Sequence, residues 1–141
     1  MSRRNPQSAQ SLVEWAISAF LLLLFAFSLL AVGHVVGEYM AVRAASSQAA
    51  FAAARAPSEE SAQAAGRRAA LQAMSGSQVR DFQITISTGG FERGGMLTAQ
   101  ASGCVSLGDF PIVSQILGRC VPLRWTAHAL IEPFRSRSRS P

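Results

Sequence analysis

Residues 10–36 read QSLVEWAISAFLLLLFAFSLLAVGHVV, and this stretch decides the fold. From Trp15 to Val36 it contains no Asp, Glu, Lys or Arg, and His34 is its only titratable side chain. A helix of this length rises roughly 33 Å at about 1.5 Å per residue, which matches a hydrocarbon core of about 30 Å. A cleaved secretory signal has a shorter apolar core of roughly 7–15 residues. We therefore expect a retained, membrane-spanning helix.

Glu14 places a carboxylate at the N-terminal edge of this apolar stretch, followed by the aromatic Trp15. A charge at the edge of hydrocarbon costs on the order of a few kcal/mol, which makes such a residue a candidate functional site. The alternative is a carboxylate that lipid headgroups hydrate and that has no specific role. Both interpretations stay open on the sequence alone.

The charges around the span set its orientation. Arg3 and Arg4 precede it, whereas Glu38 comes before Arg43 on the other side. The positive-inside tendency therefore places the N-terminus in the cytoplasm and the long C-terminal part outside it. The chain has 141 residues and a formal net charge of +5, and its thirteen basic residues are all Arg. Without the span, on the order of 100 residues remain, enough for one small domain.

The rest of the chain divides by composition. Residues 1–9 form a short basic leader, and residues 10–56 form one long helix that Pro57 ends, because proline removes a backbone donor. Ser58 followed by two glutamates is a typical helix start, so a second, Ala-rich helix is expected over 58–75. Its apolar face is expected to use Ala62, Ala65, Ala69, Leu71 and Ala73.

Beyond Gly76 the apolar period changes from helical to alternating, and residues 78–133 are expected to form a small antiparallel β domain. Three strands in a row predict a meander, with one short helical turn at residues 112–117. The fold class is thus α+β. The inward-facing positions are expected to be Phe82, Ile84 and Ile86, then Leu97, Ala99, Ala101, Gly103, Val105 and Leu107, then Val121, Leu123, Trp125, Ala127, Ala129 and Ile131.

Cys104 and Cys120 are the two cysteines of the chain, an even number in a part expected to lie in an oxidising compartment. A disulfide between them would close a loop of roughly 15 residues and contribute about 3 kcal/mol. The alternative is two separate buried thiols. Both cysteines share parity with the polar side of their strands, so a direct bridge predicts that Gln100 faces Arg124 and that Thr98 faces Thr126.

Gly33 and Gly37 form a Gly-xxx-Gly pair that continues as a small residue every fourth position: Ala41, Ala45, Ala49 and Ala53. Small residues at this spacing allow close approach of a second helix. A four-residue repeat drifts around a helix of 3.6 residues per turn, so the seam is a spiral. An Ala-rich helix also produces such spacing by chance.

The sequence has no arrangement typical of catalysis, of a metal or of a cofactor. His34 and His128 have no evident partner carboxylate or nucleophile, and the Gly-Gly pairs at 89–90 and 94–95 lack a phosphate-loop lysine. Residues 134–141 alternate Arg with Ser, which suggests phosphate binding, but they lack aromatic residues for base stacking. We expect a solvated tail and no nucleic-acid partner; RNA or DNA association is the weakest functional alternative.

Four stretches together resemble a known family: residues 10–16, the leucine-rich span, the Ala-rich stretch from Ala44 to Arg55, and the closing segment 126–133. The chain is similar to TadE-like proteins, which include TadE-type and TadG-type minor pseudopilins of the Tad (Flp, type IVb) pilus system. The family pattern usually has Gly before the cut, whereas this chain has Ala9. The resemblance implies a pilin-like fold and no enzymatic activity.

The resemblance also implies a mechanism. A prepilin peptidase would cut between Ala9 and Gln10 at the cytoplasmic face, and the span would stay in the bacterial inner membrane. Glu14 would pair with the new amino group of the same or a neighbouring subunit, because a carboxylate in an apolar bundle is tolerated when a cation satisfies it. The implied partners are the major Flp-type pilin, sibling pseudopilins and the assembly platform. An uncleaved single-pass anchor of another envelope complex is the runner-up.

Overall fold

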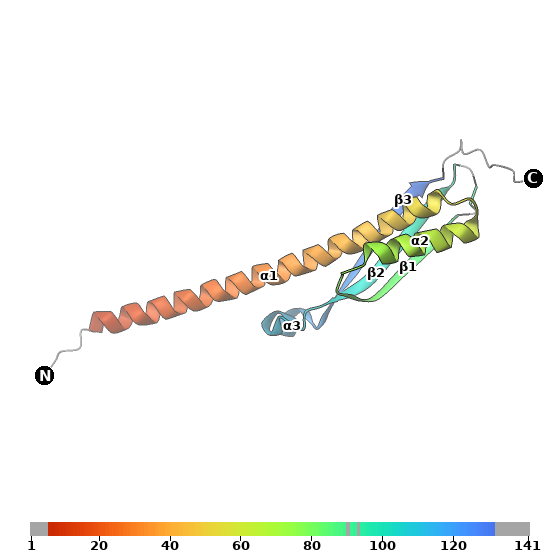
Figure 1. Cartoon of the computed structure of the whole chain (residues 1–141). Coiled ribbons are helices and arrows are strands. Elements are labelled where there is room, and N and C mark those ends of the chain that lie inside the picture. The colour runs from red at the N-terminus through yellow and green to blue at the C-terminus, as the bar shows by residue number, and fades with distance from the viewer. Residues whose placement is uncertain (1–5, 90, 93, 132–141) are drawn as a thin grey trace, which may run out of the picture.

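The computed structural model describes residues 6–89, 91–92 and 94–131. A long helix, α1 (Pro6–Ala54), extends as a rod from a globular part built around its C-terminal end (Figure 1). α1 has 49 residues and is therefore about 74 Å long. It begins four residues earlier than expected, inside the predicted leader, and it ends two residues earlier. The Arg/Ser tail at 134–141 lies outside the described residues.

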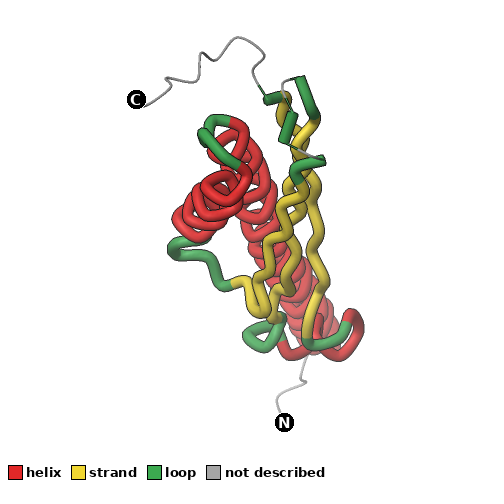
Figure 2. Tube along the Cα trace, turned by 90° about the vertical axis from the view of Figure 1, so that its right-hand side faces the viewer, coloured by secondary structure: helices red, strands yellow, loops and turns green. Residues whose placement is uncertain are grey.

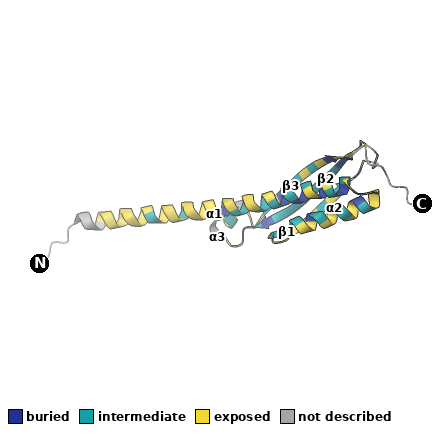
Figure 3. Cartoon of the chain, turned by 45° about the horizontal axis from the view of Figure 1, so that its top comes forward, coloured by how far each residue is buried: buried dark blue, intermediate teal, exposed yellow. Residues whose placement is uncertain are grey.

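The two ends of α1 differ in burial (Figure 3). Residues 10–30, here called the exposed segment, have exposed side chains except for the half-buried Ala19 and Leu24. Residues 42–54, the packed segment, turn one face inward through Val42, Ala45, Ser46, Ala49, Ala50 and Ala53. α1 is long and apolar enough to cross a membrane once, and it is compatible with a single-pass anchor.

The second helix, α2 (Glu59–Ala73), folds back along the packed segment of α1. Its start is confirmed: Ser58 is the N-cap, its side chain accepts from the Ser61 N–H, and the Ser61 hydroxyl oxygen accepts from the Ser58 N–H. Gly66 is buried at the crossing, where an added Cβ would lie 3.0 Å from the Ala49 carbonyl oxygen. The helices approach closely because this position has no side chain.

The expected apolar face of α2 is partly wrong. Ala62, Gly66 and Ala70 are the buried positions, whereas Leu71 is 62% exposed. These three small residues recur every fourth position and so share one face. Close contact with the alanines of α1 selects small residues over the larger Leu71, which turns to the outside.

Three strands form the predicted antiparallel meander in the order β1-β2-β3 (Figure 2). They are β1 (Val79–Ser87), β2 (Met96–Ser106) and β3 (Cys120–Leu130). The expected alternation holds on β2, where Leu97, Ala99, Ala101 and Val105 are fully buried. The α+β class and this sheet are therefore confirmed.

β1 begins three residues before Phe82, and a bulge explains why its start was not predicted. The pairing passes from Arg80 opposite Cys104 to Gln83 opposite Ser102, so two residues of β1 face Gly103. Asp81 takes a positive φ of 53° there, as an extra residue in a strand can require. Gly103 leaves room for Val79, whose Cγ1 lies 2.3 Å from where a Cβ would stand.

The core lies between the packed segment of α1 and one face of the sheet, with α2 covering its far end (Figures 1 and 2). One cluster gathers the alanines of both helices around Leu97 and Ile131. The other joins Val42 to Val105 and Leu123 nearer the middle of α1. The globular part therefore holds α1 by its C-terminal portion, and among the described residues neither core cluster includes a side chain of the exposed segment.

Candidate functional site

The N-terminal end of α1 carries the residues that the sequence singled out. Glu14 is exposed, and Trp15 is 72% exposed. No hydrogen bond or ion pair of the Glu14 side chain occurs within the part of the chain that the structure describes. Both residues belong to α1, whose N-terminal part extends away from the globular part (Figure 1). The carboxylate is thus presented to the surroundings of the chain and not to its own core.

The Ala9–Gln10 peptide bond lies within the first turns of α1, because the helix begins at Pro6. Helix ends fray at little cost in free energy, since the first turn has few hydrogen bonds to lose. A peptidase that needs extended backbone would therefore have to open only these few residues. The expected cut site and Glu14 lie little more than one helical turn apart.

Gly33 and Gly37 lie on an open face of α1. Both are exposed, and an added Cβ at either would meet nothing within 4 Å. The continuation of the small-residue seam behaves differently, because Ala45, Ala49 and Ala53 are completely buried against the rest of this chain. The spiral drift of the repeat accounts for this division: its beginning faces outward and its end faces the core.

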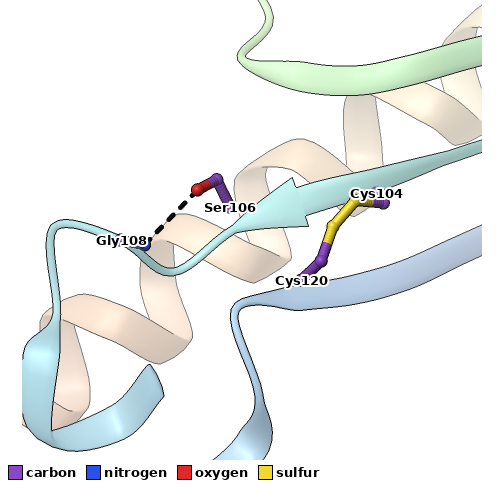
Figure 4. The surroundings of a disulfide bond; sticks show 4 residues. All are labelled: Cys104, Ser106, Gly108 and Cys120. Carbon is purple, nitrogen blue, oxygen red and sulfur yellow. Dashed lines mark hydrogen bonds between the residues drawn. A yellow bond between two sulfur atoms is a disulfide. The ribbon is translucent and has the colours of Figure 1, made fainter. Parts of the chain in front are cut away.

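The Cys104–Cys120 disulfide is present, with a Cα–Cα distance of 5.7 Å (Figure 4). The register predicted from it is wrong by two residues, because Cys104 lies opposite Pro122 and Cys120 lies opposite Ser106. The disulfide therefore joins two residues that are offset by two positions across the strand pair. The twist of the sheet permits this, because it brings residues along one diagonal of the strand pair closer together. An even offset preserves the face of each side chain, so both sulfurs still lie on the predicted side.

The corrected register changes the cross-strand neighbours on the outer face. Gln100 faces Thr126 and not Arg124, and Thr98 faces His128. The Thr98 hydroxyl lies 3.1 Å from His128 Nδ1. His128 therefore forms a hydrogen bond with the neighbouring Thr98 on the outside of the sheet.

Past the disulfide, the connection from β2 to β3 turns back toward α1. The short helix expected at 112–117 is confirmed as α3 (Pro111–Leu117). At the neck of this connection, the Leu107 N–H donates to the Arg119 carbonyl oxygen over 3.1 Å. The rings of Phe110 and His34 are 6.1 Å apart, so His34 faces this connection.

A cavity of about 410 Å³ separates this connection from the middle of α1. Its lining is almost entirely apolar: Ser28, Ala31, Val32, Val35, Val36, Leu107, Val113, Ile116 and Val121. Sequence analysis missed this cavity. The apolar residues of α1 that line it were already explained by the membrane span, and no local signal shows which way the α3 connection folds.

Polar contacts fix the globular part to α1 just beyond the apolar stretch. The Glu38 carboxylate accepts from the Ser77 hydroxyl over 2.5 Å and from the Gln78 N–H over 3.1 Å. Trp125 of β3 meets Tyr39 edge-on, with 5.6 Å between ring centroids, and Arg43 lies 5.0 Å from its ring. The sequence indicates Glu38 only as a charge that bears on membrane orientation, whereas in the structure Glu38 holds the turn between α2 and β1.

Within the described residues, no three His, Cys, Asp or Glu side chains lie close enough to bind a metal ion together. The polar hollow beside the disulfide is lined by Arg80, Asp81, Arg119 and small polar groups. The charged side chains of Arg80, Asp81 and Arg119 are exposed at this surface of the sheet.

Comparison of the chain with protein-family models, with curated proteins and with solved structures finds no match.

Proposed function

We propose that this protein is a minor pseudopilin of a Tad-type (Flp, type IVb) surface pilus, anchored in the bacterial inner membrane before assembly. The observation that carries the proposal is the position of Glu14 and Trp15. They lie just after the expected Ala9–Gln10 cut, at the free end of an apolar helix whose other end bears the globular part. Pilin-like proteins combine the same features.

The exposed segment supports a membrane or filament environment. Its large apolar side chains are mostly more than half exposed: Leu12, Val13, Trp15, Ile17, Phe20, Leu21, Leu22, Leu23, Phe25, Phe27, Leu29 and Leu30. A continuous apolar surface of this extent marks an interaction with lipid or protein. In the proposal, lipid covers it first, and neighbouring subunits cover it once the protein enters or primes the pilus.

Glu14 would then set the axial register of subunits. Cleavage after Ala9 leaves Gln10 with a free α-amino group near the carboxylate, and a cation is the partner that a carboxylate in apolar surroundings needs. A stagger that fails to join the two groups leaves a buried charge unpaired. Gly33 and Gly37, open on the same helix, would allow a neighbouring helix to approach closely.

The experiment uses Glu14→Gln, which removes the charge and keeps the shape. The protein is co-expressed with a Tad prepilin peptidase and major pilin, and its co-isolation with the pilin from membranes is measured. Glu60→Gln, an exposed carboxylate on α2, is the matched control. The proposal expects co-isolation to fall severalfold for the Glu14 variant alone. If Glu14→Gln, Glu60→Gln and the unsubstituted protein co-isolate with the pilin to the same extent, the proposal is contradicted.

An uncleaved single-pass anchor of another envelope complex is the second candidate. Two observations favour it: Ala9 stands where the family pattern usually has Gly, and α1 is helical through the expected cut. Ala9→Gly and Ala9→Leu separate the candidates. Cleavage that Gly retains and a bulky Leu abolishes supports the pseudopilin, whereas a chain that stays full-length with Gly as well supports the anchor.

A further inference from the structure

The α3 connection reaches farther along α1 toward the N-terminus than the rest of the globular part (Figure 1). Across the apolar cavity it faces positions of α1 as early as Ser28. The apolar stretch of α1 continues to Val36, and Ser28 precedes Val36 by about 12 Å along the helix axis. α3 therefore lies beside the last turns of the stretch assigned to the membrane.

The depth of α3 relative to the membrane does not depend on which residue is taken as the start of the span. A span that ends at Val36 places α3 within the outer boundary of the hydrocarbon. A span of about 20 residues that begins at Gln10 ends next to Ser28, again beside α3. In both cases the short helix lies where acyl chains meet headgroups.

The side chains described within α3 suit the boundary between acyl chains and headgroups, and the exposed charge of Asp109 precedes the helix. Ile116 is 80% exposed, and Val113 is half-buried beside the cavity. The sequence of α3, PIVSQIL, has no charge. Charged groups gather behind it at the neck of the connection, where exposed Arg80 and Arg119 lie with Asp81 around the disulfide.

We propose that α3 is a second membrane contact, which inserts into the outer boundary of the bilayer that α1 spans, with lipid filling the cavity between them. This inference rests on the membrane-spanning helix of the proposed function. Interfacial helices place their apolar side about 5–10 Å into the headgroup–acyl boundary. α3 and α1 thereby fix the globular part against the membrane at two points.

The disulfide gives this contact its position. Cys104 and Cys120 join β2 to β3 at the base of the connection, and the hydrogen bond from Leu107 to Arg119 closes it one step further on. Figure 4 shows the bridge joining β2 to β3 beside Ser106, and Gly108 beyond Ser106, where the chain leaves the sheet toward α3. A connection closed at its base holds α3 beside α1, where an open one would sample many positions.

The test places one tryptophan at a time in the full chain, reconstituted in phosphatidylethanolamine–phosphatidylglycerol vesicles. Ile116→Trp is made in a Trp15→Phe, Trp125→Phe background, and Leu71→Trp is the matched control, because Leu71 is also exposed but lies on α2. A Trp125→Phe chain that keeps Trp15 reports on insertion of α1. Quenching is measured with headgroup-proximal nitroxide lipids and with aqueous iodide.

The proposal expects the tryptophan at position 116 to be quenched severalfold more by nitroxide lipid than the one at position 71, and severalfold less by iodide. Iodide quenching at 116 equal to that at 71, while Trp15 stays lipid-quenched, would overturn the second contact and leave the span standing. Protection from both quenchers would also overturn it and indicate a second copy of the chain on α3. Iodide access to Trp15 would contradict the span itself.

The unsubstituted protein provides an independent measurement. Photoactivation of a diazirine phospholipid in the same vesicles, followed by reduction and trypsin, yields the peptide 94–119, which contains α3, and the peptide 69–80 from the end of α2. Lipid adducts on 94–119 and not on 69–80 support the contact. Equal labelling of the two peptides contradicts it.

Discussion

The exposed segment and the packed segment of α1 belong to one continuous helix, yet they use apolar residues in opposite ways. Leu22 and Phe25 in the exposed segment are large and have most of their surface uncovered, whereas Ala45 and Ala49 in the packed segment are small and completely covered. The size of each residue follows from what covers it. Close helix packing within the chain selects small side chains, and an external apolar environment accommodates large ones.

This difference also locates function along α1. The packed segment is satisfied by its own sheet and by α2, so its residues contribute to stability. The exposed segment has no such partner in the described residues, and in the proposed function lipid or other subunits would cover it. Substitutions in the two segments should therefore affect different measurements.

The largest contrast is expected between Leu97→Ala and Leu22→Ala. Leu97 is fully buried at the centre of the core, so its truncation should lower the free energy of unfolding by about 2–5 kcal/mol. Leu22 is 68% exposed, and its truncation should change that free energy by less than about 0.5 kcal/mol. Urea unfolding in detergent micelles, followed through Trp125 in a Trp15→Phe background, measures both. Equal losses would contradict the division of α1.

Removal of the disulfide should rank second. Cys104→Ser combined with Cys120→Ser opens a connection whose ends are 16 residues apart and should cost about 3 kcal/mol in the same unfolding experiment. Reduction of the unsubstituted protein is the control and should cost a similar amount. The helical circular-dichroism signal of α1 should remain, because the bridge joins two strands. A change below about 0.5 kcal/mol would contradict a stabilising role.

The smallest contrast compares two glycines of different surroundings. Gly66→Ala introduces a Cβ about 3.0 Å from the Ala49 carbonyl oxygen and 3.3 Å from Ala53 Cβ, and this overpacking should cost about 1–3 kcal/mol. Gly33→Ala meets nothing and should leave unfolding of the single chain within about 0.5 kcal/mol. The variant at position 33 should instead weaken association with partner helices. If Gly33→Ala lowers the free energy of unfolding more than Gly66→Ala does, then Gly33 and not Gly66 lies on a face packed within the chain, which contradicts this account.

The sequence predicts the structure correctly where the deciding pattern involves only neighbouring residues. The alternation at Phe82, Ile84 and Ile86 predicted a strand with one covered face, and Ser58 before two glutamates predicted the start of α2. The parity of Cys104 and Cys120 predicted their common face. Each prediction depends on the periodicity or cap chemistry of a few neighbouring residues, and long-range packing did not override it.

Prediction failed where position depends on distant partners. The apolar character of Leu71 predicts a place on the covered face of α2, but the close approach at Gly66 reserves that face for small residues. The strand register was two residues off because a diagonal disulfide and a direct one share the same parity. The return of α3 toward Ser28 depends on the fold of the whole connection, which no local pattern encodes.

In the proposed function, cleavage after Ala9 exposes the amino group of Gln10 near Glu14. This cleavage is tested most directly by the intact mass of the protein extracted from membranes under non-reducing conditions, with an active or an inactivated Tad prepilin peptidase. The account predicts loss of Met1 to Ala9 with the active enzyme alone, and a mass lower by two hydrogens that reflects the Cys104–Cys120 bridge. A full-length chain in the presence of active peptidase would contradict the account.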